Sequence, residues 1–347
     1  MSKPQIHSFK SSFTTESGTK IPNPKIAYQS WGMLNDTKDN VVFICHALTG
    51  NTGADEWFGG LIGRDKTINP KKHFIICPNI LGSCYGSTGP TSINPKTGKA
   101  WQADFPVITI RDIVRFNQKL LDELEIEGIE LVIGGSLGGM TALEFTLMDM
   151  RVKSAALLVM GKAHLPWAIA ISHAQRMAIY ADKNWKDGFY DPKRPPKKGL
   201  AAARAMAMIS YRAPKNYANK FGREIHPEKN IYQVESYLRY QGEKLAERFD
   251  ANTYIILSKA MDSHDVSRGR GSFENVFENL NKPVLVVGFD SDRLYPIEEQ
   301  RELAELIPNS HFAELASPYG HDAFLIEFEQ INTELKPFYH SLKTRTS

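Results

Sequence analysis

One ten-residue stretch, from Leu131 to Met140, constrains the fold of this chain more than any other. It begins as an apolar, β-branched run typical of a buried strand and continues as G-G-S-L-G-G-M. The pattern Gly134-x-Ser136-x-Gly138 matches G-x-S-x-G, in which small flanking residues let a strand turn sharply into a helix and expose a strained serine. We therefore expect Ser136 to lie at a helix N-terminus with its hydroxyl facing a cleft.

Glycine-rich turns between a strand and a helix also bind phosphates in nucleotide-binding proteins, but that alternative does not fit this stretch. A G-x-G-x-x-G pattern starting at Gly134 would need glycine where Ser136 stands. No G-K-[ST] follows, as a P-loop would require. The pattern favours a serine nucleophile, which needs a histidine and a carboxylate elsewhere in the chain.

The spacing of apolar residues along the sequence divides the chain of 347 residues into three parts. Short β-rich runs alternate with helical or loop stretches up to about residue 160 and return after residue 280; they cover residues 41–45, 74–77, 131–133, 155–160, 284–287 and 311–315. Helix formers dominate between them, at residues 168–171, 201–208 and 234–248, with loop breaks at 191–196 and 267–271. We expect an α/β domain with a mostly parallel central sheet, built from residues 1–161 and 281–347, and a helical lid inserted as residues 162–280.

Composition excludes several other classes of protein. With 42% hydrophobic and 23% charged residues the chain resembles an ordinary globular protein, and a net charge of +3 is too small to suggest nucleic acid as a partner. Three cysteines without a C-x-x-C pair predict neither a disulfide framework nor a metal site, and favour the cytoplasm. The polar N-terminus and the lack of an apolar stretch of about 18 residues argue against secretion and against membrane insertion.

Chain order narrows the choice of base. In enzymes with a nucleophile elbow of this kind the order is nucleophile, acid, histidine, and the last two lie on loops after late strands. Only His311, His321 and His340 lie beyond the helical region. His311 begins a predicted strand and His340 belongs to a polar terminal helix, which leaves His321, in a loop after the last strand.

The loop that follows the strand at 284–288 offers two candidates for the acid, Asp290 and Asp292. Aspartate commonly caps turns and helices, so one of the two is expected to have only that role. Local spacing leaves the choice between them open.

An oxyanion hole requires two preorganised backbone N–H groups. One should come from Leu137, directly after the nucleophile, and the other from the loop at 46–50, which follows an early strand. His46, in that loop, is expected to be structural rather than a second base.

Several longer motifs resemble those of the homoserine O-acetyltransferase family, and the resemblance covers nearly the whole chain. They are CHALTG at 45–50, NILGSCYGSTGP at 79–90, SINP at 92–95, GGSLGGM at 134–140, QR at 175–176, VESYLRYQGEKLAERFDAN at 234–252, SDRLYP at 291–296 and GHDAFL at 320–325. The resemblance implies an α/β-hydrolase fold with Ser136 as nucleophile, His321 as base and Asp292, rather than Asp290, as acid.

The same resemblance implies an amino-acid site beside the triad. It assigns the homoserine carboxylate to Arg204 and Tyr211, which are seven residues apart and therefore on one face of a helix, and the substrate amine to Asp322. A substrate with one carboxylate and one ammonium group needs one cation and one anion near the nucleophile.

The implied reaction is a ping-pong transfer of an acetyl group from acetyl-CoA to L-homoserine through an acyl-serine, in methionine biosynthesis. The backbone N–H groups of Leu48 and Leu137 would bind the oxyanion. Acetyl-CoA is a co-substrate, and no cofactor or metal is expected. The lid would exclude water from the acyl-enzyme and would also form a homodimer.

Three alternatives remain. Relatives use succinyl-CoA or accept serine, although the segment at 84–89, with Tyr85, resembles the acetyl-type members. A plain esterase of the same fold would carry the same triad. A non-catalytic binding protein on this scaffold is disfavoured because Ser136, Asp292 and His321 are all present.

Overall fold

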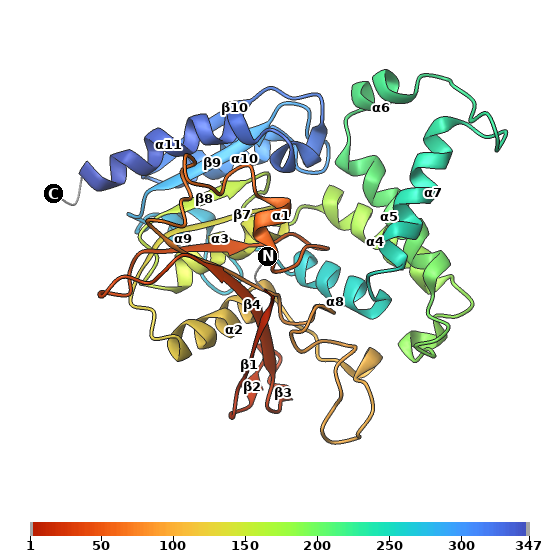
Figure 1. Ribbon diagram of the computed structural model, residues 1–347, viewed down its shortest axis with the longest axis horizontal. Coiled ribbons are helices and arrows are strands. Elements are labelled where there is room, and N and C mark those ends of the chain that lie inside the picture. Colours follow the sequence, from red (N-terminus) through yellow and green to blue (C-terminus); the bar gives the residue numbers. More distant parts are fainter. Residues whose placement is uncertain (1–2, 345–347) are drawn as a thin grey trace.

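The computed structural model describes residues 3–344, and its centre is one large sheet with helices on both faces (Figure 1). Within these residues eight strands form the sheet in the order β1-β4-β6-β5-β7-β8-β9-β10. Their bounds are Gln5–Ser8 for β1, Lys25–Trp31 for β4, Val41–Cys45 for β5, Phe74–Pro78 for β6, Ile129–Gly135 for β7, Ala155–Leu158 for β8, Val284–Phe289 for β9 and Ser310–Leu315 for β10. All neighbours from β6 to β10 pair in parallel, which confirms the predicted fold class.

The N-terminal strands were not predicted. Strands β1 and β4 extend the sheet by antiparallel pairing next to β6, and a separate hairpin pairs β2 (Phe13–Thr14) with β3 (Lys20–Ile21). These strands are short or half-exposed, and they lack the continuous apolar run that marks the central strands.

The apolar runs of the central strands exist because both faces of the sheet are buried. In β5 the side chains alternate: Val41 and Phe43 join the core on one face, and Val42 and Ile44 join the core on the other. The first core includes side chains of α2 (Ile110–Glu123), α3 (Leu137–Met148) and α10 (Ile297–Leu306), and the second includes those of α1 (Ala54–Trp57) and α11 (Phe328–Thr344).

Between β8 and β9 the regular elements are helices, joined by loops and a few isolated bridges. Its helices are α4 (Pro166–Tyr180), α5 (Lys197–Tyr211), α6 (Pro214–Phe221), α7 (Gln233–Ala246), α8 (Ala251–Asp262) and α9 (Phe273–Phe277). Helices α4, α5, α6 and α7 extend to one side of the sheet, and α5 packs against both α4 and α7 (Figure 1). Short 3₁₀ segments at Gln102–Asp104, Lys186–Gly188 and Gly320–Leu325 complete the chain.

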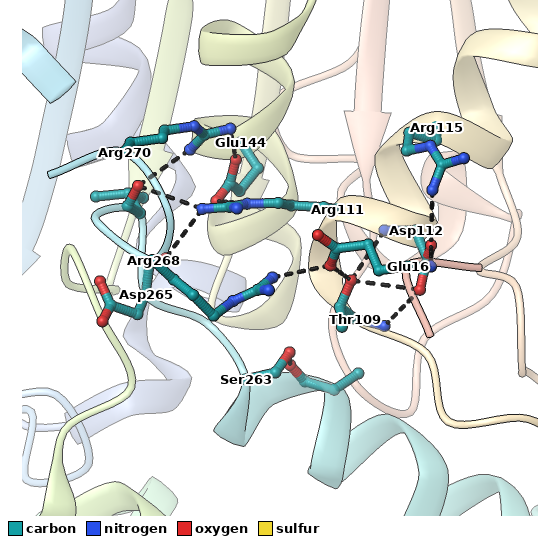
Figure 2. A network of polar contacts seen from close by, with 12 residues as sticks. Glu16, Thr109, Arg111, Asp112, Arg115, Glu144, Ser263, Asp265, Arg268 and Arg270 are labelled. Atoms are coloured by element: carbon teal, nitrogen blue, oxygen red, sulfur yellow. Dashed lines mark hydrogen bonds and ion pairs between the residues drawn. The ribbon is translucent and has the colours of Figure 1, made fainter. Parts of the chain in front are cut away.

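A network of arginines and carboxylates joins the segment after α8 to helices α2 and α3, which pack on one face of the sheet (Figure 2). The side chain of Glu144, on α3, is 2% exposed. Its carboxylate accepts hydrogen bonds from Arg111 Nε at 3.0 Å and from Arg270 Nη2 at 2.8 Å. Arg111 also donates to the backbone carbonyls of Asp265 and Val266, each at 3.3 Å. The segment that returns from α8 to the sheet is therefore held by charged hydrogen bonds.

Replacing Glu144 with alanine is expected to lower the free energy of unfolding by about 3 kcal/mol, because two partly buried guanidinium groups lose their carboxylate. Chemical denaturation measures this loss. The control is Glu314→Ala, which removes the partner of Arg301 in an ion pair that is about half exposed on both sides and is worth at most about 1 kcal/mol. Equal losses in the two variants would mean that burial does not strengthen the network.

The three cysteines are unpaired. Cys45 and Cys77 are buried and Cys84 is partly buried. Burial raises the pKa of all three thiols, that of Cys84 to about 11. In the part of the chain that the structure describes, no helix is long and apolar enough to span a membrane.

Candidate active site

Ser136 occupies the turn between β7 and α3, as the glycine pattern predicts. Its backbone has φ 57° and ψ −126°, a strained combination for a residue with a side chain, which costs about 1–3 kcal/mol. Ser136 takes the N-cap position of α3 but makes no side-chain capping hydrogen bond. The side chain is therefore not used as a cap, and the strain is that of a nucleophile elbow.

Close packing explains why glycines flank the serine. A β-carbon on Gly134 would lie 2.3 Å from the carbonyl oxygen of Gly138, and one on Gly138 would lie 2.1 Å from the carbonyl oxygen of Cys45. Both distances are too short for any larger residue. The start of α3 thus packs directly on the end of β5 and on the loop that follows.

That loop brings the second predicted oxyanion donor to the same edge of the sheet. Among the described residues, neither the Leu48 nor the Leu137 backbone N–H donates a hydrogen bond. His46, beside them, is 1% exposed and has both ring nitrogens engaged, Nδ1 with Ala47 O at 2.9 Å and Nε2 with Asn79 Oδ1 at 3.0 Å. Its contacts are those of a structural histidine.

His321 and Asp292 form a close buried pair. Nδ1 of His321 lies 2.7 Å from Oδ2 of Asp292, and the two side chains are 3% and 0% exposed. The other oxygen, Oδ1, accepts hydrogen bonds from the backbone N–H groups of Leu294 at 2.8 Å and Tyr295 at 3.0 Å. The carboxylate is thereby oriented toward the imidazole, the geometry required of the acid in a triad.

Asp290 has the structural role that was expected for one of the two aspartates, since it binds a backbone N–H group. It is exposed, and its Oδ1 accepts a hydrogen bond from the backbone N–H of Ser317 at 3.0 Å. This contact ties the loop after β9 to the loop after β10, which leads to His321. Asp290 therefore shapes the site without touching the imidazole.

Phe324 links the histidine to the elbow. Its ring lies 5.7 Å from the ring of His321, and a β-carbon on Gly135 would lie 2.5 Å from Phe324 Cδ2. The residue before Ser136 and the loop of His321 are thus in contact. The structure brings Ser136, His321 and Asp292, the predicted triad, to the carboxyl edge of the sheet, where α/β proteins place their sites.

Of the three predicted substrate residues, Tyr211 and Asp322 lie next to His321, and Arg204 lies next to Tyr211. Arg204 and Tyr211 share a face of α5, as their spacing predicts, with the Arg204 guanidinium carbon 5.4 Å from the Tyr211 ring centre. The Tyr211 ring lies 5.5 Å from that of His321. Burial raises the pKa of Tyr211, partly offset by the charge of Arg204, and burial also raises the pKa of Asp322.

Arg212 also lies at the candidate site, although the sequence did not predict it. Its Nε lies 2.8 Å from Oδ2 of Asp322, an ion pair with both side chains at most 20% exposed. The position directly after Tyr211, at the end of α5, was the only local signal. A substrate ammonium group at Asp322 would have to share the carboxylate with this guanidinium.

Arg248 links Tyr85 to the loop that contains Leu48, the predicted oxyanion donor. Nη1 of Arg248 donates to the Tyr85 hydroxyl and, at 3.1 Å, to the carbonyl of Thr49, the residue after Leu48. The segment at 84–89 therefore lies close to the predicted acyl site. Among residues 3–344, no three His, Cys, Asp or Glu side chains are arranged to hold a metal ion.

Comparison with known proteins agrees with this geometry. The family model for the alpha/beta hydrolase fold matches residues 40–328. The homoserine O-acetyltransferase of Chlorobium chlorochromatii (strain CaD3) is 52% identical over 335 residues, which cover 95% of this chain and 94% of that protein.

Two crystal structures have the same overall fold. The homoserine O-acetyltransferase from Bacillus anthracis superposes with a TM-score of 0.90 at 26% identity and covers 97% of each chain. The esterase E22 superposes equally well, with a TM-score of 0.90 at 25% identity over 97% of this chain and 99% of that one. The resemblance drawn from the motifs is confirmed: this chain has the α/β-hydrolase fold and belongs to the homoserine O-acetyltransferase family.

Proposed function

We propose that this protein transfers an acetyl group from acetyl-CoA to the side-chain hydroxyl of L-homoserine, a step in methionine biosynthesis. One observation carries the proposal: the His321–Asp292 pair adjoins groups suited to an amino acid. Tyr211 packs on the His321 ring, Asp322 follows it in the chain, and Arg204 lies beside Tyr211. Esterase chemistry alone would not require the paired cation and anion.

The first half-reaction acylates the enzyme. The Ser136 oxygen attacks the thioester carbonyl while His321 Nε2 takes its proton, and the oxyanion accepts hydrogen bonds from the Leu48 and Leu137 N–H groups. The carbon–sulfur bond then breaks, and His321 returns the proton to the CoA sulfur. Asp292 orients the imidazole and stabilises its charged form.

The second half-reaction repeats these steps with the acceptor. The homoserine hydroxyl loses its proton to His321 and attacks the acyl carbon, and Ser136 leaves with the proton restored. Arg204 would bind the substrate carboxylate and Asp322 the ammonium group. The segment at 84–89 supports acetyl rather than succinyl as the transferred group, because it resembles the acetyl-type members at Tyr85, which Arg248 links to the loop that contains Leu48.

A donor and acceptor matrix tests this proposal. Acetyl-CoA and succinyl-CoA are each combined with homoserine, serine or no acceptor, and free CoA and the products are measured. We expect CoA release that depends on homoserine, with O-acetylhomoserine as product. The second candidate is an esterase, which the likeness to esterase E22 favours; release of CoA without an acceptor, with acetate as the product, would establish that alternative.

Arg204→Gln is expected to raise the KM for homoserine about 10- to 100-fold, because a charge-assisted bond to a carboxylate contributes about 1.5–3 kcal/mol. Acylation by acetyl-CoA should change by less than about twofold, since Arg204 would contact only the acceptor. Lys198→Gln, an exposed cation on the same helix, is the control. An unchanged KM in Arg204→Gln would mean that the acceptor site lies elsewhere.

The lid surface supports a homodimer. Nine of the fifteen exposed large apolar side chains in the described residues lie within residues 162–280: Trp167, Met177, Tyr180, Phe189, Met206, Ile209, Ile225, Tyr232 and Tyr240. Such a concentration is typical of a protein interface. The free, largely buried thiols fit a cytoplasmic enzyme.

The double variant Ile209→Glu/Tyr240→Glu is expected to convert the dimer into a monomer, because two charges would be buried without partners. Size-exclusion chromatography with light scattering measures the mass. Met150→Glu, at a side chain that is 90% exposed outside the lid, should leave the dimer intact. A monomeric unmodified protein, or a double variant that stays dimeric, would contradict the proposed interface.

A further inference from the structure

A second chain of buried polar groups lies behind the catalytic histidine. The hydroxyl of Tyr295 is 2.9 Å from Nδ1 of His164, and the two residues are 0% and 5% exposed. Nε2 of His164 is 3.4 Å from the Ser172 hydroxyl and 3.7 Å from Oδ1 of Asp262. These side-chain contacts therefore extend from the loop after β9, through the segment before α4, to the end of α8.

Both members of the Tyr295–His164 pair are in their neutral forms. Burial lowers the pKa of His164 to about 3 and raises the pKa of Tyr295, so the ring is neutral and the phenol is protonated. A phenol that donates to Nδ1 leaves the ring proton on Nε2, the nitrogen that faces Ser172 and Asp262. Asp262 Oδ1 is buried and has no hydrogen-bond partner among the described residues, and Oδ2 is bound by Arg176 at 2.6 Å.

Tyr295 also contacts both members of the pair at the active site. Its ring centre lies 5.3 Å from that of His321, and its backbone N–H donates to Oδ1 of Asp292 at 3.0 Å. A shift of Tyr295 would therefore displace the imidazole and its carboxylate together. The hydroxyl, 2.9 Å from His164, is what anchors the far end of the ring.

We propose that Tyr295 is a positioning residue for His321, and that its hydrogen bond to His164 holds the imidazole in the orientation needed to take a proton from Ser136. Through the hydrogen bond of His164 to Ser172 on α4, and the approach of its Nε2 to Asp262 at the end of α8, that orientation depends on the lid. This inference rests on the proposed function only in taking His321 as the base for Ser136. The lid would then have two functions: it would form the acceptor site and help to orient His321.

The test uses the full-length enzyme with p-nitrophenyl acetate, which requires neither homoserine nor CoA. Ser136 attacks the ester carbonyl, His321 takes the proton, the ester carbon–oxygen bond breaks and nitrophenolate leaves. Tyr295→Phe should lower the rate constant of acylation about 10-fold, since small misplacements of a catalytic group are costly, and leave the KM for the ester within about twofold. The downfield NMR resonance of the His321 Nδ1 proton should shift or broaden, and this readout does not depend on activity.

Variants at His164 separate positioning from packing. His164→Leu removes the acceptor and should reproduce the rate loss of Tyr295→Phe, whereas His164→Asn, whose Oδ1 can replace Nδ1, should restore most of the rate. The double variant Tyr295→Phe/His164→Leu should be no slower than either single variant. Additive rate losses would overturn the proposal.

A second buried tyrosine–histidine pair offers a matched control. Tyr339 and His73 are 2.8 Å apart near the start of β7, at the opposite edge of the sheet. Tyr339→Phe should lower the melting temperature as Tyr295→Phe does, with acylation unchanged. The positioning role would be refuted if Tyr295→Phe left both the acylation rate and the His321 resonance unchanged. If the unmodified enzyme did not react with the ester, the proposed acyl-serine chemistry would be refuted, and the NMR measurement would still test the positioning role.

Discussion

Ser136→Ala is expected to lose acyl-enzyme formation, with the rate of acetyl transfer falling about 10⁵- to 10⁶-fold. The elbow holds this hydroxyl in a strained backbone conformation and without a capping bond, and alanine leaves no oxygen at that position. Incubation with acetyl-CoA followed by mass spectrometry should detect one added acetyl group in the unmodified protein and none in the variant.

Ser154→Ala is a suitable control for that experiment. Ser154 is also fully buried, but its hydroxyl donates to the carbonyl of Glu130, at the start of β7 and away from the carboxyl edge of the sheet. The control should acylate at the normal rate. An acetyl adduct that persists in Ser136→Ala would show that another residue is the nucleophile.

Asp292→Asn is expected to lower kcat about 10⁴-fold with little change in fold stability. An amide at this position can accept the Leu294 and Tyr295 N–H groups through its oxygen, but it then presents an NH₂ group to His321 Nδ1. The imidazole would be held in the wrong tautomer and could not take a proton from Ser136. Steady-state kinetics with acetyl-CoA and homoserine measures the loss.

Asp290→Asn is the matched control, two residues away on the same loop. Its oxygen can still accept the Ser317 N–H, and its side chain does not reach the histidine, so kcat should stay within about threefold. A large loss in Asp290→Asn together with normal kcat in Asp292→Asn would reverse the assignment of the acid.

Local pattern was enough to predict the elements on which the site stands. The central strands lie where the apolar runs indicated, because burial on both faces leaves an unmistakable composition in a parallel strand. The glycines around Ser136 mark a position where two backbones touch, which is a property of a few neighbouring residues. Helices α4, α5 and α7 likewise coincide with the stretches rich in helix formers.

Contacts between segments that are far apart in the sequence could not be predicted from local sequence patterns. The choice between Asp290 and Asp292 depends on which side chain points inward from a shared loop, and the residues alone left it open. The pairing of Arg212 with Asp322 and that of Tyr295 with His164 each join segments more than a hundred residues apart. No periodicity or spacing records such a pairing, because it follows from how the lid lies on the sheet.

The neighbouring positions of β8 and β9 in the sheet also have a consequence for folding. These strands pair in register, Ala155 with Val284, although residues 159–283 lie between them. Bringing the ends of so long a segment together costs at least about 4 kcal/mol in chain entropy if the segment is unstructured. Packing of the lid helices shortens the effective loop, so the sheet should be completed late, after the lid has formed, and the arginines bound to Glu144 would then secure the closing strand.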